Sequence, residues 1–342
     1  MQTFNAPTAN DLWALLCERF RAPEVNHQSS DRGPTRELLH VGFSLSDPSQ
    51  RWISSRRPPV NVAFALAEVL WILCGRRDAA FLGAWNSQLA GFVGGEPTHH
   101  GAYGYRLRAH FGIDQLQRAC EALSRNPDSR QVVLQLWDPR HDLPDVEGRA
   151  VSGDIPCNVV SLLKVREGRL EWMQVMRSND LFRGLPYNIV QFTFLQEVFA
   201  GWLGIGMGTY NQLSDSLHMY EADRLTIEAR GEPRRFASPS YALPWGASVD
   251  VLGTVLARIE VLSKRDVALR EVFGLHEGLP PAYANIVVVL AAEKLRRLGH
   301  RDEAAAIAAA CTDPALSTLW TQWYQTRPTT NAVTHGTRRA GT

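Results

Sequence analysis

Hydrophobic residues recur at helical spacing over residues 9–21, and a polar loop rich in turn-forming residues follows them. The loop leads into a segment near residues 36–45 that predicts a short strand. Residues 58–75 are strongly apolar and predict a buried helix opened by Pro58 and Pro59, because proline is tolerated in a first helical turn. A second helical segment is expected near residues 78–91.

The middle of the chain is rich in β-branched and apolar residues. Strands are expected at residues 131–137, 158–165 and 169–178, with a tight turn at 166–168 between the last two. Residues 185–203 predict a long buried helix, and glycines at 204–208 end it before another strand. Up to about residue 240 the pattern therefore predicts an α+β fold in which antiparallel strands are packed by buried helices.

Beyond residue 244 the composition shifts towards Ala, Leu, Val and Arg at helical spacing, which predicts an all-helical region. The last residues are polar and rich in Thr and Arg. We therefore expect three parts: a first domain at residues 1–244, a helical C-terminal region at 245–326 and a disordered tail at 327–342.

Composition restricts the kinds of partner. With 36 basic and 35 acidic residues the formal net charge is +1, which argues against nucleic acid or a membrane surface as partner. The five cysteines contain no CxxC pair and predict neither a disulfide framework nor a structural zinc site. The longest strongly apolar run, Val60–Cys74, is shorter than the roughly 18 residues needed to cross a bilayer. Since the N-terminal residues also lack a secretory signal, we expect a soluble, cytoplasmic protein.

Two residues stand out against their surroundings. Glu68 lies within the apolar run, where a buried carboxylate needs either a partner or a chemical role; an ion pair or a surface position would be the ordinary explanation. Cys157 follows Pro156 at the start of a predicted strand. A lone cysteine is usually a small core residue, but a basic neighbour would lower the pKa of its thiol and make it a nucleophile.

Polar residues are also dense between a predicted strand and a buried helix, at Arg177, Ser178, Asp180 and Asn188. Helix capping is the common reason for Ser, Asn or Asp at such a place. Capping does not explain Arg177, nor Asn188 inside the apolar helix, because a buried amide needs partners for both its donor and its acceptor. The segment is therefore a candidate site.

Taken in order, these residues resemble the thymidylate synthase family. The features are a Glu in an apolar helix, Pro-Cys at a strand start, the motif Arg-Ser-x-Asp-x-x-x-Gly-Leu-Pro-Tyr-Asn at 177–188, and His-x-Tyr at 218–220. The match covers about residues 31–220. It implies a thymidylate synthase-like fold and a homodimer. It also implies folate-dependent transfer of a one-carbon unit to C5 of a pyrimidine nucleoside monophosphate, dUMP or UMP.

The resemblance implies a catalytic role for each matching residue. Cys157 would attack C6 of the pyrimidine, and Arg177 would keep the sulfur ionised and touch the phosphate. Asn188 would bind the edge of the base, which favours uracil because an amide can accept from N3–H and donate to O4. Glu68 would organise water and proton transfer, and a raised pKa would suit that role. Tyr103 would assist removal of the C5 proton.

Other matching residues would bind the two substrates. The co-substrate implied is 5,10-methylenetetrahydrofolate, with no metal; Asp180 would bond its pterin, and Trp85, Gly184 and Tyr187 would line its pocket. The nucleotide phosphate and sugar would be held by Arg32, by Arg130 from across a dimer interface, and by Ser178, His218 and Tyr220. The ordinary alternatives are a surface strand arginine at Arg130 and solvent-facing polar residues at His218 and Tyr220.

The chain departs from the family pattern at several positions. Asn158 replaces the His that commonly follows the nucleophile, and Gln131 replaces a second Arg, for which Arg36 could compensate. The family's short apolar C-terminal segment, which excludes water from the folate, has no counterpart in the final residues THGTRRAGT. Because water exclusion selects a methyl product, these differences leave two alternatives open. One is a uridylate or cytidylate 5-hydroxymethylase of a modified-nucleotide or antibiotic pathway, and the other is a non-catalytic nucleotide-binding protein.

Overall fold

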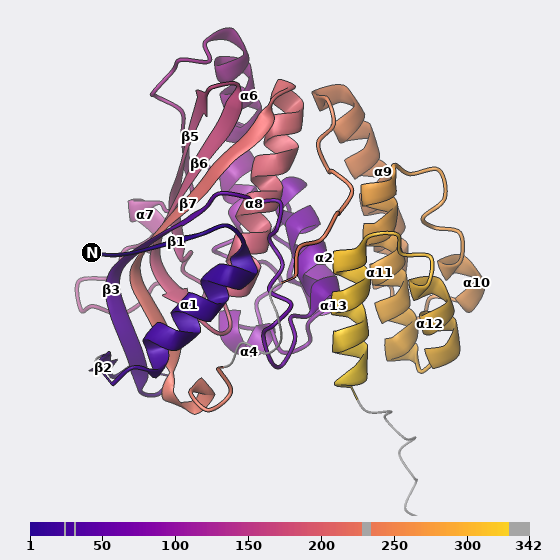
Figure 1. Ribbon diagram of the computed structural model, residues 1–342, viewed down its shortest axis with the longest axis horizontal. Helices are drawn as coiled ribbons and strands as arrows, with labels where there is room; N and C mark the ends of the chain where they lie inside the picture. Colours follow the sequence, from indigo (N-terminus) through magenta and orange to yellow (C-terminus); the bar gives the residue numbers. More distant parts are fainter. Residues whose placement is uncertain (24, 31, 228–233, 328–342) are drawn as a thin grey trace, which may run out of the picture.

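The computed structural model describes residues 1–23, 25–30, 32–227 and 234–327. Its centre is a seven-stranded sheet with the order β1–β3–β7–β6–β5–β4, in which the short β2 also pairs with β3 (Figure 1). The strands are β1 (Gln2–Ala6), β2 (Asn26–Gln28), β3 (Thr35–Leu45), β4 (Val133–Gln135), β5 (Asn158–Arg166), β6 (Arg169–Asp180) and β7 (Gly206–Tyr220).

The sheet is mixed rather than antiparallel, which corrects the expectation from the sequence. The pairs β1–β3 and β6–β7 are parallel, whereas β2–β3, β3–β7, β4–β5 and β5–β6 are antiparallel. The reason for β6–β7 is the long helix between them, which returns the chain to the same end of the sheet before β7 begins. The predicted turn between β5 and β6 is confirmed: Glu167 and Gly168 have φ of 52° and 68°, as a two-residue hairpin turn with both central residues left-handed requires.

Two predicted helices have the expected bounds, α1 (Ala9–Arg21) and α8 (Leu185–Leu203). The apolar helix, α2 (Val62–Leu73), begins later than predicted. Pro58 and Pro59 precede it, and the Asn61 side chain caps it by accepting from the N–H of Phe64 at 3.1 Å. An Asn side chain that accepts from a backbone N–H marks the residue before the first helical turn, so α2 begins after Asn61 rather than at the two prolines. The segment near 78–91 forms two short helices, α3 (Ala79–Gly83) and α4 (Ala90–Val93), rather than one.

Short elements connect α4 to the sheet. They are α5 (Tyr103–Tyr105), the π-helix η1 (Arg106–His110), α6 (Gln115–Arg125) and α7 (Pro139–Asp142), and the 3-10 turn η2 (Glu221–Asp223) follows β7. Gly104 lets α5 lie against α2, because a Cβ on it would come within 2.3 Å of the carbonyl oxygen of Ile72. Only glycine permits this approach, and it brings the start of α5 close to the helix that carries Glu68.

The C-terminal region is helical, as the sequence predicts. Its helices are α9 (Trp245–Ser263), α10 (Leu269–Val272), α11 (Pro281–Leu298), α12 (Arg301–Ala308) and α13 (Pro314–Gln325). Helix α8 lies against β6 and β7, α2 packs on α8, and α11 and α13 cover α2 from the other side (Figure 1). This position between two layers explains why α2 is apolar all round.

The buried side chains of the sheet, α2 and the C-terminal helices form one continuous core. The division at residue 244 therefore remains a prediction, and residues 328–342 of the predicted tail lie outside the described residues. Among the described helices, none combines the length and apolar content that crossing a bilayer would require.

Candidate active site

The predicted nucleophile lies at the junction of two central strands. Cys157 is half-buried directly before β5, and its carbonyl oxygen accepts from the backbone N–H of Arg177 on β6 at 2.9 Å. The Arg177 guanidinium donates from Nε to the carbonyl of Pro156 and from a terminal nitrogen to that of Ile155, both at 2.9 Å. Arg177 thus fixes the backbone that leads into the thiol.

The electrostatics of the thiol differ from the expectation. Burial raises the pKa of Cys157 above its ordinary value, while Arg177 and, more weakly, Arg32 lower it. The expected effect of Arg177 is present in direction, but burial and the nearby carboxylates of Asp154 and Asp180 outweigh it. The thiol is therefore protonated near neutral pH in the free protein.

Glu68 has the raised pKa that the sequence predicts. Burial raises the pKa of this carboxyl group to about 7, and a hydrogen bond from the side chain of Gln191 on α8 partly opposes the rise. Its Oε2 is buried without a hydrogen-bond partner among the described residues. A carboxyl group with this pKa can both give and take a proton near neutral pH.

Tyr103, the first residue of α5, is near enough to both Cys157 and Glu68 to interact with them electrostatically. Burial raises the pKa of its phenol, and the neighbouring Cys157 and Glu68 raise it further. The Tyr103 ring packs 6.1 Å from that of Phe192, between centroids. The hydroxyl therefore stays protonated and can act as a hydrogen-bond donor close to the thiol.

The amide of Asn188 is held in a fixed orientation. Asn188 is 8% exposed in the first turns of α8 and donates from Nδ2 to Oδ1 of Asn179 at 3.1 Å. Asn179 in turn donates to Oγ of Ser214 on β7 at 3.2 Å. These hydrogen bonds fix which side of the Asn188 amide carries the oxygen and which carries the nitrogen. A side chain that discriminates between bases needs such a fixed orientation.

Asp180 ends β6 and begins the turn into α8. Its Oδ1 accepts from the backbone N–H groups of Phe182 and Arg183, each at 2.8 Å, and burial raises its pKa. Asp180 pairs in register with His218 of β7. The N–H of Gly184 donates to the Asp180 carbonyl at 3.0 Å, which closes the turn. Ser178, two residues earlier on β6, is half-buried.

Trp85 and Tyr187 are joined through the cap of α2. The Asn61 backbone N–H donates to the Tyr187 hydroxyl at 3.1 Å, and Asn61 Nδ2 donates to the Trp85 carbonyl at 3.3 Å. Trp85 is 1% exposed, and its indole N–H is buried with no partner in the described chain. Arg297 of α11 also donates to the carbonyls of Ala84 and Trp85. The C-terminal helices therefore support this wall of the site, a contact that sequence reasoning missed.

The four remaining predicted residues lie in β7 or in the turns that precede β3 and β4. His218 and Tyr220 are half-buried on β7, with ring centroids 5.8 Å apart and perpendicular planes. Arg32 is exposed in the turn before β3, near enough to Cys157 to affect the pKa of the thiol. Arg130 is exposed in the bend before the edge strand β4, so its predicted role depends on a partner chain.

Two further residues belong to the site although the sequence analysis assigned them no role there. Asn158 is fully buried beside Cys157; its Oδ1 accepts from Gln174 at 2.9 Å, and a hydrogen bond from its side chain to Tyr103 partly opposes the rise in the pKa of that phenol. Asp154 accepts from the Gly101 N–H at 2.9 Å and raises the pKa of both Cys157 and Tyr103. The sequence offered one indication of a role for these two residues, which is their position within four residues of Cys157.

The idea that Arg36 replaces the missing second arginine is not supported. Arg36 is 4% exposed and donates to the carbonyl oxygen of Ala22 at 2.5 Å, so its guanidinium is already bound within the protein. A buried arginine with such a bond is a structural residue, because releasing it would leave a buried acceptor unpaired.

Several curated proteins are similar in sequence to this chain. The chain is 37% identical over 210 residues to a deoxyuridylate hydroxymethyltransferase of Pseudomonas phage M6, covering 58% of each chain. It is 33% identical over 199 residues to a deoxyuridylate hydroxymethyltransferase of Bacillus phage SP01, covering 55% of this chain and 51% of the relative. An archaeal relative from Methanothermobacter marburgensis, whose name includes the words thymidylate synthase, is 37% identical over 121 residues, 35% of this chain and 51% of its own.

The chain thus spans a little over half the length of the curated relatives it matches. The thymidylate synthase family description matches residues 39–254, which is more than half of the chain and extends from β3 into α9. This range contains Glu68, Tyr103, Cys157 and the 177–188 motif. The chain belongs to the thymidylate synthase family.

Proposed function

We propose that this protein transfers a one-carbon unit to C5 of deoxyuridylate through a covalent bond between Cys157 and C6 of the base. The observation that carries the proposal is the grouping of one thiol, one neutral phenol and one carboxyl group of raised pKa around the same strand junction. Nucleotide binding alone requires none of these three groups, whereas proton transfer coupled to nucleophilic addition requires all of them.

In the first step Cys157 loses its proton to water and its sulfur adds to C6. The new S–C6 bond forms while the C5=C6 electron pair moves towards C5 and O4, which makes C5 nucleophilic. Arg177 and Arg32 stabilise the thiolate, since both lower the pKa of the thiol. After C5 has bonded to the one-carbon unit, the C5 proton is lost to water held by Tyr103, and its electron pair forms a C5=CH2 bond as the carbon–nitrogen bond to the departing folate breaks. Addition of water or hydride to this CH2 group then moves the electron pair back to re-form C5=C6, which breaks the S–C6 bond and releases the thiolate.

Two amides are suited to the pyrimidine edge. Asn188 can accept from N3–H and donate to O4, because Asn179 fixes its orientation. Asn158 places a buried amide N–H donor next to the nucleophile, where family members commonly have histidine, and its side chain also hydrogen-bonds with Tyr103. A donor at this place stabilises negative charge that develops on O4, and Glu68 near its pKa of about 7 can supply a proton there.

The residues on the α2 side fit a reduced folate. The buried Trp85 indole N–H and the Glu68 Oε2 are polar atoms without partners in the described structure, and Asp180 keeps one carboxylate oxygen beyond its two turn bonds. Asp180, Trp85, Gly184 and Tyr187 would hold the group. When bound, 5,10-methylenetetrahydrofolate supplies the one-carbon unit and, for a methyl product, the hydride.

We further propose a homodimer that forms through the sheet face opposite α8. This face carries partly exposed apolar side chains. Leu39 on β3 is 48% exposed, and Met173 on β6, two strands away across β7, is 36% exposed and pairs in register with Leu162 on β5. Apolar patches of this kind mark interaction surfaces. A twofold partner would bring a second Arg130 towards the phosphate, because such an interface pairs the same surface on both chains.

The product proposed is the hydroxymethyl nucleotide. Two relatives are named deoxyuridylate hydroxymethyltransferases, and the half-buried Cys157 beside an exposed Arg177 leaves the site open to water. Water attack on the transferred carbon gives a hydroxymethyl group, whereas hydride transfer gives a methyl group. The methyl product is the second candidate, because the archaeal relative's name includes thymidylate synthase.

The test is incubation of the protein with dUMP and 5,10-methylenetetrahydrofolate, with UMP, dCMP and CMP in parallel. We expect dUMP to gain the mass of CH2O without formation of dihydrofolate. A gain of CH2 together with dihydrofolate absorbance would assign the methyl product instead. No release of tritium from C5-labelled substrate, and no adduct with 5-fluoro-dUMP, would overturn catalysis and leave a nucleotide-binding protein.

Two variants separate the chemistry from the fold. Cys157→Ser should abolish turnover and the 5-fluoro-dUMP adduct, while Cys311→Ser, at another half-buried thiol in the connection between α12 and α13, should retain both. The dimer is tested by mixing inactive Cys157→Ser and Arg130→Ala proteins under exchange conditions. Random pairing should restore about a quarter of the native activity if Arg130 acts across the interface, and none if it acts within its own chain.

A further inference from the structure

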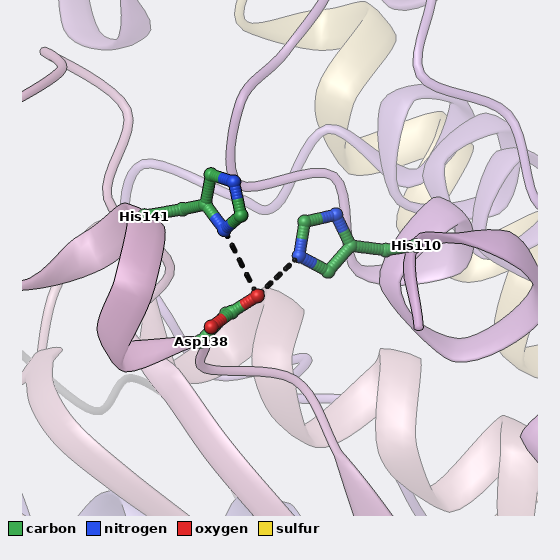
Figure 2. Close-up of side chains that lie close together, drawn as sticks. All are labelled: His110, Asp138 and His141. Atoms are coloured by element: carbon green, nitrogen blue, oxygen red, sulfur yellow. Dashed lines mark hydrogen bonds and ion pairs between the residues drawn. The ribbon is translucent and has the colours of Figure 1, made fainter. Parts of the chain in front are cut away.

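Three side chains outside the proposed catalytic site converge on one point. His110 ends the π-helix η1, Asp138 caps α7 and His141 lies within α7. Figure 2 shows both imidazole rings directed at one carboxylate oxygen. Oδ2 of Asp138 lies 2.9 Å from Nε2 of His110 and 2.9 Å from Nδ1 of His141, and the three atoms are all within 4.8 Å of one another.

The carboxylate is held so that one oxygen stays available. Oδ1 of Asp138 accepts from the N–H of Arg140 at 3.0 Å, which leaves Oδ2 to the two imidazoles. A carboxylate oxygen that lies between two imidazole nitrogens is a donor set that zinc-like ions accept.

A rigid second layer supports these residues. Asp142 is fully buried and accepts two hydrogen bonds from Arg106, at 2.8 and 2.9 Å, and one from the backbone N–H of Asp138 at 2.7 Å. The imidazole Nε2–H of His100 donates to the same carboxylate at 2.8 Å. Arg106 begins η1 and Asp142 ends α7, so this pair locks the two elements that carry the three side chains. Such outer support is typical of metal sites.

Access and spacing also suit an ion. The side chains of Asp138 and His110 are 9% and 15% exposed, whereas that of His141 is 54% exposed, so one side of the cluster opens to solvent. Zinc bonds of about 2.0–2.2 Å in a tetrahedron place ligand atoms about 3.3 Å apart. The two separations of 2.9 Å from Asp138 Oδ2 need to widen by a few tenths of an ångström, and the two imidazole nitrogens lie within 4.8 Å of each other. Water from the open side would complete the coordination.

We propose that His110 Nε2, Asp138 Oδ2 and His141 Nδ1 bind a divalent transition-metal ion of the Zn²⁺ class. The ion would join the end of η1 to α7, and η1 directly follows α5, which carries Tyr103. Its effect would be to stiffen the segment that presents the phenol rather than to enter the reaction. The sequence analysis expected no metal, because the cysteines contain no CxxC pair and the family resemblance implies none. The cluster has no local sequence signal, since His110 is remote in sequence from Asp138.

The test is equilibrium dialysis of the whole chain against Zn²⁺ with a competing chelator and a phosphine reductant. We expect one saturable Zn²⁺ per chain, with affinity falling at least tenfold in His141→Ala and in His110→Gln. His141 is the more exposed ligand, so its variant should fold normally. Zn²⁺ should also raise the Tm of the native protein and slow hydrogen exchange over residues 103–110, and both effects should disappear in the two variants.

Two control variants distinguish this site from others. His27→Ala removes an exposed imidazole that faces a single carboxylate, Glu221, at 3.3 Å, and should leave Zn²⁺ affinity unchanged. Cys157→Ser should also leave it unchanged. Absence of saturable binding, equal affinity in His141→Ala, or loss of binding in Cys157→Ser would overturn the proposal and assign the cluster as a hydrogen-bonded structural feature.

Discussion

Replacing Glu68 with Gln should make the protein less sensitive to alkaline pH. Burial raises the pKa of Glu68 from 4.5 to about 7, so the folded protein holds this proton more tightly than the unfolded chain does. Below pH 4.5 the group is protonated in both states, and its contribution to stability is fully present. As the pH rises through about 7 that contribution is lost, because the folded state must then hold a buried charge.

The size of this effect follows from the pKa difference. Each pKa unit corresponds to about 1.4 kcal/mol, so the rise from 4.5 to about 7 gives an upper limit of about 3 kcal/mol for the stability lost by the native protein. Glu68→Gln has no such loss. The free energy of unfolding of the variant, minus that of the native protein, should therefore increase by up to about 3 kcal/mol between pH 4.5 and pH 8.

Urea unfolding of both proteins at several pH values measures this difference directly. Titrations shared by the two proteins cancel, and Glu18→Gln on the exposed face of α1 gives the background for the same chemical change. A difference that stays constant from pH 4.5 to pH 8 would refute the raised pKa. It would also remove the basis for Glu68 as a proton donor at neutral pH.

Three further predictions concern other parts of the site. Iodoacetamide should alkylate Cys157 more slowly than free cysteine at pH 7 and faster as the pH rises, because burial raises the pKa of its thiol. Arg177→Met should slow the alkylation further, and rapid labelling of Cys157 at pH 7 would contradict the raised pKa. Glu293→Gln should lower the free energy of unfolding by about 3–5 kcal/mol in urea, because the fully buried carboxylate accepts three hydrogen bonds of 2.8 Å from Arg296 and Arg297. Asn188→Asp should reduce kcat/KM for dUMP at least tenfold and shift preference towards dCMP, and an unchanged ratio would exclude Asn188 as the residue that reads the base.

The sequence by itself determined most of the secondary structure. Helix α8, the β5–β6 hairpin and the helical C-terminal region depend on local periodicity, on Pro at a helix start and on a two-residue turn, all of which act within a few residues. It also identified the family and the principal candidates, because Glu68 and the 177–188 motif conflict with their apolar surroundings. Residues that contradict local patterning are often those retained for function.

Only the tertiary structure decided the strand pairing, the contacts around the site and the pKa values, because these depend on residues that are distant in sequence. The parallel pairing of β6 with β7, the support of Trp85 by Arg297, and the meeting of His110 with Asp138 and His141 join segments that local sequence cannot relate. The pKa of Cys157 is the clearest case. The family motif in the sequence suggests that Arg177 lowers the pKa of this thiol. Packing decides how strongly the charge of Arg177 and the burial of the sulfur each act on that pKa, and burial outweighs the charge.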